Sequence, residues 1–165
     1  MYDIGEWIQT LWQTTHKEEI ESDAIFEKFI SQVLGTIYDP YAFILYEELD
    51  HIADCLIVGN EAGLDEEFEK QRQRKQIGFA RELKERVKYK QNRYDLGHWA
   101  FSIYLEVYPG FGSIVYALGT MESDPQFWYS YEELDQIADE LLTGKPLDWE
   151  DFDKRKKGDS EEVAE

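Results

Sequence analysis

Apolar residues recur along much of the chain with the spacing of three and four that is typical of an amphipathic helix. The clearest case is a nine-residue stretch that occurs twice, from Tyr46 to Asp54 and from Tyr131 to Asp139. The periodic apolar residues are Leu49, Ile52, Ala53, Leu56 and Ile57 in the first copy and Leu134, Ile137, Ala138, Leu141 and Leu142 in the second. Each copy is therefore predicted to form a helix with one buried stripe. No alternating pattern bounded by hairpin turns is present, which favours an all-α fold.

The ends of the second of these helices carry recognisable signals. Ser130 and Glu133 have the spacing of a capping box, and Gly144 is placed to end the helix in a left-handed conformation. The first copy has Leu45 where the cap serine would be. We therefore expect packing, rather than a side-chain cap, to hold the start of the first helix.

Further helices are predicted around these two. Their ranges are Gly5–Thr14, Asp23–Leu34, Leu96–Val107, Phe111–Leu118, a short stub at Trp149–Lys154, and a long helix from Leu64 or Asp65 to beyond Val87. The long helix would have Phe68, Phe79, Ala80, Leu83 and Val87 on its inner side and Gly78 as a weak point. The polar tail, 155–165, is expected to be disordered.

A second repeated motif suggests that the whole chain is duplicated. The stretch from Tyr2 to Trp7 recurs from Tyr94 to Trp99, so that both motifs occur in the same order in each half. The fold is thus predicted to be all-α, with two tandem related helical units packed as one bundle-like domain. The predicted divisions are a first unit at 1–70, a basic connecting helix at 71–93, a second unit at 94–154 and the tail.

Charge narrows the possible partners. The 165 residues include 36 acidic and 17 basic side chains, for a net charge of -19. Nucleic-acid binding and docking on an anionic membrane both depend on Lys and Arg, so this balance argues against either. With 42% hydrophobic and 15% aromatic residues, the chain is nevertheless expected to fold.

The charge is also segregated along the chain. Residues 1–70 carry -14, residues 71–93 carry +7 and residues 94–165 carry -12. We expect the basic segment to lie against the carboxylates of one or both acidic units, offsetting their self-repulsion; a basic patch for a separate anionic partner is the alternative.

The repeated helix supplies the candidate binding residues. Its acidic side chains at spacings of three and seven fall away from the apolar stripe, and aromatic residues immediately precede it. The predicted partner-binding residues are Glu47, Asp50, Asp54, Trp128, Tyr129, Glu132, Asp135 and Asp139. Carboxylates beside aromatic anchors are typical of protein-binding hot spots, although a solvated face and core packing are the simpler explanations.

Catalytic and metal-binding chemistry has little support. Glu48 and His51 have the Glu-x-x-His spacing of di-iron bundles, but the second copy has Gln136 in place of the histidine. The single cysteine, Cys55, is expected to be a packing residue. No phosphate-binding, dinucleotide-binding, zinc-protease or nucleophile-elbow motif is present in the sequence. The prediction is a protein that is not an enzyme and uses no metal or cofactor.

The start of the chain bears on location. It is acidic where a signal peptide would be positive, and no apolar run approaches the roughly 18 residues that span a bilayer. We expect a cytoplasmic protein that does not act at membranes.

Small size, acidity and the repeated Y-E-E-L-D-x-I-A-D and Y-D-[IL]-G-x-W motifs resemble the helical immunity proteins of bacterial polymorphic-toxin and contact-dependent inhibition systems. That resemblance implies a protein that binds and neutralises a cognate toxin, here expected to be basic and of nuclease type. A DNA mimic that occupies a DNA-binding protein is the first alternative, although the basic segment would interrupt its track of carboxylates. An intracellular helical-repeat adaptor is the second.

Overall fold

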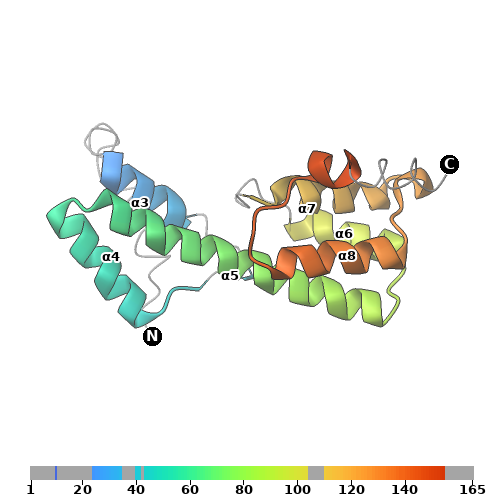
Figure 1. Cartoon of the computed structure of the whole chain (residues 1–165), viewed down its shortest axis with the longest axis horizontal. Helices are drawn as coiled ribbons and strands as arrows, with labels where there is room; N and C mark the ends of the chain where they lie inside the picture. The colour runs from blue at the N-terminus through green and yellow to red at the C-terminus, as the bar shows by residue number, and fades with distance from the viewer. Residues whose placement is uncertain (1–9, 11–23, 35–39, 42, 104–109, 155–165) are drawn as a thin grey trace. The chain divides into compact units, whose positions relative to one another are not determined.

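The computed structural model describes residues 10, 24–34, 40–41, 43–103 and 110–154, and all the secondary structure in them is helical (Figure 1). No strand occurs among these residues, which confirms the predicted all-α class. The chain divides into two compact units, Met1–Gln71 and Arg72–Glu165. The predicted helix at Gly5–Thr14, the Tyr2–Trp7 motif and the tail lie outside the described residues.

The first unit contains α3 (Ala24–Leu34), α4 (Tyr46–Val58) and the beginning of α5 (Glu61–Lys88). Each of the three helices contributes two buried apolar side chains to one core. These are Phe29 and Ile30 from α3, Ile52 and Cys55 from α4, and Leu64 and Phe68 from α5. Burial of such side chains contributes about 1.5–3 kcal/mol each for the large ones, so this cluster holds the three helices together.

A tight turn joins α4 to α5. Gly59 has a φ of 69°, which an L side chain rarely adopts, and the N–H of Asn60 donates to the carbonyl of Cys55 at 2.8 Å. The Asn60 side chain then accepts from the N–H of Gly63 at 3.0 Å and so caps α5. A Cβ on Gly63 would lie 2.8 Å from Cys55 Sγ, so the glycine lets the two helices approach closely.

The second unit contains the rest of α5, α6 (Arg93–Ile103), α7 (Gly112–Gly119), η1 (Thr120–Glu122), η2 (Pro125–Phe127), α8 (Tyr131–Leu142) and a helical turn at 149–154. Phe79 lies at the centre of its core, stacked on Trp99 with a centroid distance of 5.0 Å and packed against Phe111 at 5.8 Å. The inner side predicted for the long helix is confirmed, since Phe68, Phe79, Ala80, Leu83 and Val87 are all buried.

Buried polar side chains of α5 hold the end of α8. Arg72 donates to the carbonyl of Gly144 at 2.6 Å, and Gln76 donates to the carbonyls of Leu141 and Lys145 at 2.9 and 2.6 Å. The Leu141 carbonyl lies in the last turn of α8, and the other two carbonyls lie just beyond its end. Gly144 has a φ of 73°, which confirms the predicted left-handed end of this helix.

The two repeated helices begin differently. Ser130 Oγ accepts from the N–H of Glu133, and the Glu133 carboxylate accepts from the N–H of Ser130, so the predicted capping box of α8 is confirmed. For the start of α4 the prediction is right in part: Ile44 packs against the core of the first unit, whereas Leu45 is exposed and Glu48 Oε2 accepts from its N–H at 2.9 Å. Half of a capping box survives without the serine.

The buried stripe predicted for α4 is wrong in part. Ile52 is buried and Leu49 and Leu56 are partly so, but Ala53 and Ile57 are exposed. The covered side is centred on Ile52 and Cys55, because α3 and α5 both pack there.

Two helices begin earlier than predicted. The helix α5 starts at Glu61 and runs without a break through Gly78, and α6 starts at Arg93. The reason is an asparagine cap in both cases: Asn60 caps α5, and Asn92 Oδ1 accepts from the N–H of Asp95 at 2.8 Å.

Candidate protein-binding surfaces

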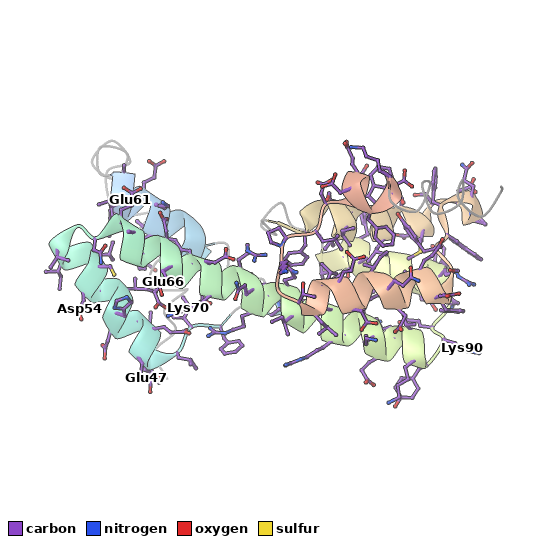
Figure 2. All side chains as sticks on the ribbon, in the orientation of Figure 1. Glu47, Asp54, Glu61, Glu66, Lys70 and Lys90 are labelled. Atoms are coloured by element: carbon purple, nitrogen blue, oxygen red, sulfur yellow. The ribbon has the colours of Figure 1, made fainter. Side chains whose placement is uncertain are left out.

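The first candidate surface is the outer face of α4. Glu47, Asp50 and Asp54 are all exposed, and their spacing of three, four and seven places them on one side of the helix. In Figure 2, Glu47 and Asp54 project from the side of α4 that faces away from α5. These three of the predicted partner-binding residues therefore form one continuous acidic strip.

Exposed apolar side chains lie among these carboxylates. Tyr46 is 75% exposed, Ile57 81% and Val58 75%. Ile57 follows Asp50 by seven residues and Asp54 by three, so it shares their side of the helix. We use the term outer face of α4 for these six residues: Tyr46, Glu47, Asp50, Asp54, Ile57 and Val58. Ile57, predicted to lie in the buried stripe, is instead part of the apolar half of this surface.

The carboxylates of the outer face of α4 have no basic partner among the described residues. Other acidic residues of the same unit do: Lys28 pairs with Glu61 at 3.3 Å and with Asp65. The hydrogen bond that Lys28 donates to Asp65 is the main cause that raises the pKa of Lys28. Among the described residues, the carboxylates of the outer face of α4 thus differ from those of Glu61 and Asp65, which are paired.

The matching carboxylates of α8 are paired. Lys84 Nζ lies 3.1 Å from Asp135 Oδ1 and 2.7 Å from Asp139 Oδ1. The hydrogen bonds that Lys84 donates to Asp139 and, second in size, to Asp135 raise the pKa of Lys84. Glu132 is exposed and makes no ion pair with any described residue.

The other basic side chains of the segment 71–93 differ in their contacts. Arg86 pairs with Glu82 on its own helix, and its guanidinium lies 4.3 Å from the ring centre of Trp99. Arg81 is exposed and makes no ion pair in the described part of the chain. The expected ion pairing between the basic segment and an acidic helix is therefore present at Lys84 but does not extend along the whole segment.

The second candidate surface is a cleft of about 480 Å³ in the second unit, which we call the aromatic cleft. The two predicted residues Trp128 and Tyr129 line it, together with residues of α7, η1, η2 and the turn at 149–154. Trp149 Nε1 donates to the Tyr129 hydroxyl at 2.5 Å and so connects two segments of the wall. Burial raises the pKa of Tyr129, an effect that this hydrogen bond partly offsets.

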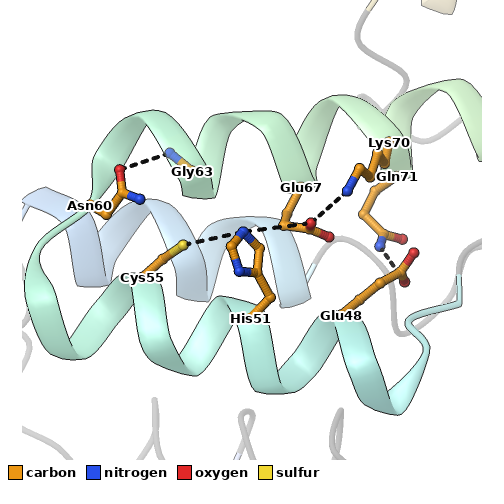
Figure 3. A network of polar contacts seen from close by, with 8 residues as sticks. All are labelled: Glu48, His51, Cys55, Asn60, Gly63, Glu67, Lys70 and Gln71. Atoms are coloured by element: carbon orange, nitrogen blue, oxygen red, sulfur yellow. Dashed lines mark hydrogen bonds and ion pairs between the residues drawn. The ribbon is translucent and has the colours of Figure 1, made fainter.

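A polar network between α4 and α5 contains a cysteine, a histidine and a glutamate, which are residue types that can form a catalytic triad (Figure 3). Cys55 Sγ lies 3.8 Å from His51 Nε2, and Glu67 Oε1 lies 3.9 Å from the same nitrogen. In a catalytic triad, the nucleophile contacts one ring nitrogen of the histidine and the orienting carboxylate contacts the other. Here both groups lie near the same nitrogen. Cys55 is also only 2% exposed, in the core as predicted, so no substrate reaches its thiol. This network is structural.

The remaining contacts of the network support that conclusion. Glu48, the partner of His51 in the Glu-x-x-His spacing, accepts from Leu45 N and from Gln71 Nε2 instead. Glu67 is buried and accepts from Lys70 at 2.8 Å, and its second oxygen has no hydrogen-bond partner in the described part of the chain. Among the described residues, no three His, Cys, Asp or Glu side chains are placed to hold a metal ion.

Comparison with protein families, with curated proteins and with solved structures finds no match to this chain. Within the described residues, none of the helices combines the length and the apolar composition required to cross a bilayer.

Proposed function

We propose that the protein binds a basic protein through the outer face of α4 and acts as an immunity protein against a toxin of that charge. One observation carries the proposal. Three exposed carboxylates, Glu47, Asp50 and Asp54, lack basic partners among the described residues and lie among exposed apolar side chains.

The two kinds of side chain do different work in binding. Negative charge attracts a basic partner over distance and can bring association rates to about 10⁸–10⁹ M⁻¹s⁻¹ at low salt. Exposed ion pairs add little affinity, so contact at short range must come from apolar area. Tyr46 is of the residue type that is enriched in hot spots, and Ile57 and Val58 extend the apolar area beside it.

A toxin is the basic partner that best fits such a surface. Nuclease domains carry Lys and Arg to bind phosphates, and a cell that makes one must capture it quickly. The repeated motifs that resemble helical immunity proteins include the acidic residues of this surface. A DNA mimic fits less well, because Ile57 and Val58 interrupt the carboxylates with apolar side chains that phosphates would not match.

The test is a rescue of growth. The gene upstream of this chain's gene is expressed in a susceptible host, with and without the chain. We expect the upstream product to be toxic and the chain to restore growth. Asp50→Lys combined with Asp54→Lys should abolish the rescue, because the surface then repels a basic partner.

A matched variant separates this surface from the total charge. Glu85→Lys combined with Glu132→Lys makes the same change in net charge at exposed positions of the second unit. This variant should still rescue growth. An upstream product without toxicity, or equal loss with both variants, contradicts the proposal.

A further inference from the structure

The walls of the aromatic cleft are rings and carboxylates. Five aromatic side chains line it: Tyr116, Phe127, Trp128, Tyr129 and Trp149. Tyr116, Phe127 and Trp128 are exposed although they are large, so the cleft is open to solvent. The guanidinium of Arg93 already lies 5.7 Å from the ring centre of Trp128, so one of these rings is in part occupied. The exposed parts of the rings can still present their faces to a ligand.

The charge of the cleft is negative. Asp148, Glu150 and Asp153 line it, and among the described residues no Lys, Arg or His does so. Lys154 lies 3.9 Å from Glu150, but both side chains are more than 70% exposed, and such a pair contributes little. The cleft therefore keeps an excess of negative charge.

Several hydrogen-bond donors in the cleft are already used within the protein. Trp128 Nε1 donates to the carbonyl of Met121 at 2.8 Å, and Trp149 Nε1 donates to Tyr129. The hydroxyls of Ser113 and Thr120 donate to Asp148 and to the carbonyl of Ala117. What the walls offer is mainly acceptor oxygens and ring faces, so a matching ligand must bring positive charge and donors.

We infer that the aromatic cleft binds an arginine side chain presented by another polypeptide. A guanidinium is planar, stacks on aromatic rings and donates to carboxylates in a fixed fork, and the cleft supplies both partners. The chain already uses this contact internally, because the guanidinium of Arg93 lies 4.1 Å from the ring centre of Tyr131. A free small molecule fits less well, since such ligands usually have most of their surface buried and this cleft is open.

This inference concerns the second unit alone and does not depend on the proposed function. The aromatic cleft and the outer face of α4 have no residue in common. The cleft can therefore bind arginine even if the chain does not neutralise a toxin.

The experiment is a titration of the full chain with a short glycine–serine peptide that contains Arg-Ser-Arg. It is followed by NMR of the tryptophan indole N–H signals at physiological salt, where the Debye length is about 8 Å. The signals of Trp128 and Trp149 should shift and saturate, and that of Trp99, which lies in the core, should not. A peptide with citrulline, the uncharged analogue of arginine, should bind about tenfold more weakly or not at all.

Two variants of equal charge locate the site. Glu150→Gln with Asp153→Asn should weaken binding of the arginine peptide about tenfold, because it removes two carboxylates of the cleft. Glu66→Gln with Glu85→Gln removes the same charge at exposed positions that belong neither to the cleft nor to the outer face of α4, and it should change the affinity less than about twofold. Melting curves of both variants check that they are folded.

Four results would overturn the inference. They are the absence of any saturable shift, equal binding of the citrulline peptide, equal weakening by the two variants, and shifts that involve Trp99 as strongly as the cleft tryptophans.

Discussion

The helices α4 and α8 contain almost the same nine-residue motif but have different surroundings. In α8 the tyrosine and both aspartates contact other parts of the second unit. The Tyr131 hydroxyl donates to the carbonyls of Lys90 and Gln91, and Lys84 pairs with Asp135 and Asp139. In α4 the matching Tyr46, Asp50 and Asp54 are exposed and lack such contacts among the described residues. A repeated motif can therefore hold a fold together in one place and remain open to a partner in another.

The two helices differ in the segments of the chain that pack against them. The second half of α5 and the turn to α6 supply Lys84, two backbone carbonyls and Arg93, all of which contact α8. No described residue of the first unit takes the same positions against α4. The motif is the same, and the availability of its side chains depends on what packs over it.

The largest expected effect compares the two tyrosines. Tyr131→Ala should lower the free energy of unfolding by about 2 kcal/mol, because it removes the hydrogen bonds to Lys90 and Gln91 and the ring under Arg93. Tyr46→Ala should change it by less than about 0.5 kcal/mol. Urea unfolding measures both. Equal losses would show that Tyr46 is as firmly held as Tyr131, and the comparison would fail.

The next effect concerns association with a basic partner. Asp50→Asn with Asp54→Asn should slow association about tenfold at low salt, equivalent to about 1.4 kcal/mol. Asp135→Asn with Asp139→Asn makes the same change in charge at the same motif positions, and it should slow association less because the positive charge of Lys84 already offsets part of theirs. Stopped-flow or surface-plasmon kinetics give both rates. A larger effect from the α8 pair would reverse the assignment of the binding helix.

A smaller effect is expected at the helix starts. Ser130→Ala removes the hydroxyl that accepts from Glu133 N–H and should cost about 1 kcal/mol. Leu45→Ser should complete the box at α4 and stabilise the chain by about 0.5 kcal/mol, because Glu48 already accepts from that N–H. Thermal unfolding of the two variants, together with the wild type, checks both signs. A loss on Leu45→Ser would mean that the leucine contributes packing after all.

The smallest effect is that of pH on Lys84. Its pKa is raised above the usual 10.5, so the protonated form is favoured by folding. The stability that this pair contributes is fully present below pH 10.5 and is lost as the pH rises through the higher folded value. A Lys84→Met variant should therefore show a flatter dependence of stability on pH in that range. An identical dependence would mean that Lys84 does not pair with α8 in solution.

Much of the fold could be predicted from periodicity and capping. The all-α class, the inner side of α5 and both ends of α8 depend on local patterns that few tertiary contacts override. The starts of α5 and α6 were missed because Asn60 and Asn92 act as caps, a signal that was present in the sequence and not used. That the two units descend from one duplicated unit stays a prediction.

The candidate surfaces were harder to predict. Periodicity shows that α4 has a wide apolar arc. It does not show which part of this arc is covered by neighbouring helices, and for this reason the prediction that Ile57 is buried is wrong. The aromatic cleft joins residues as far apart as Tyr116 and Asp153, and its carboxylates come from a stretch that appeared to be only a helical stub. Contacts of this kind depend on how the helices pack, which no local pattern encodes.

The mixture of charge and apolar area on α4 also determines which molecules can meet there. Without the neighbouring carboxylates, the exposed apolar side chains of Tyr46, Ile57 and Val58 would favour self-association of the chain. Each copy carries a charge of -19, so the net charge opposes the approach of a second copy and would favour the approach of the basic protein proposed above. On the proposed function, the carboxylates would select partners by the sign of their charge, and the apolar side chains would then select among them by shape complementarity.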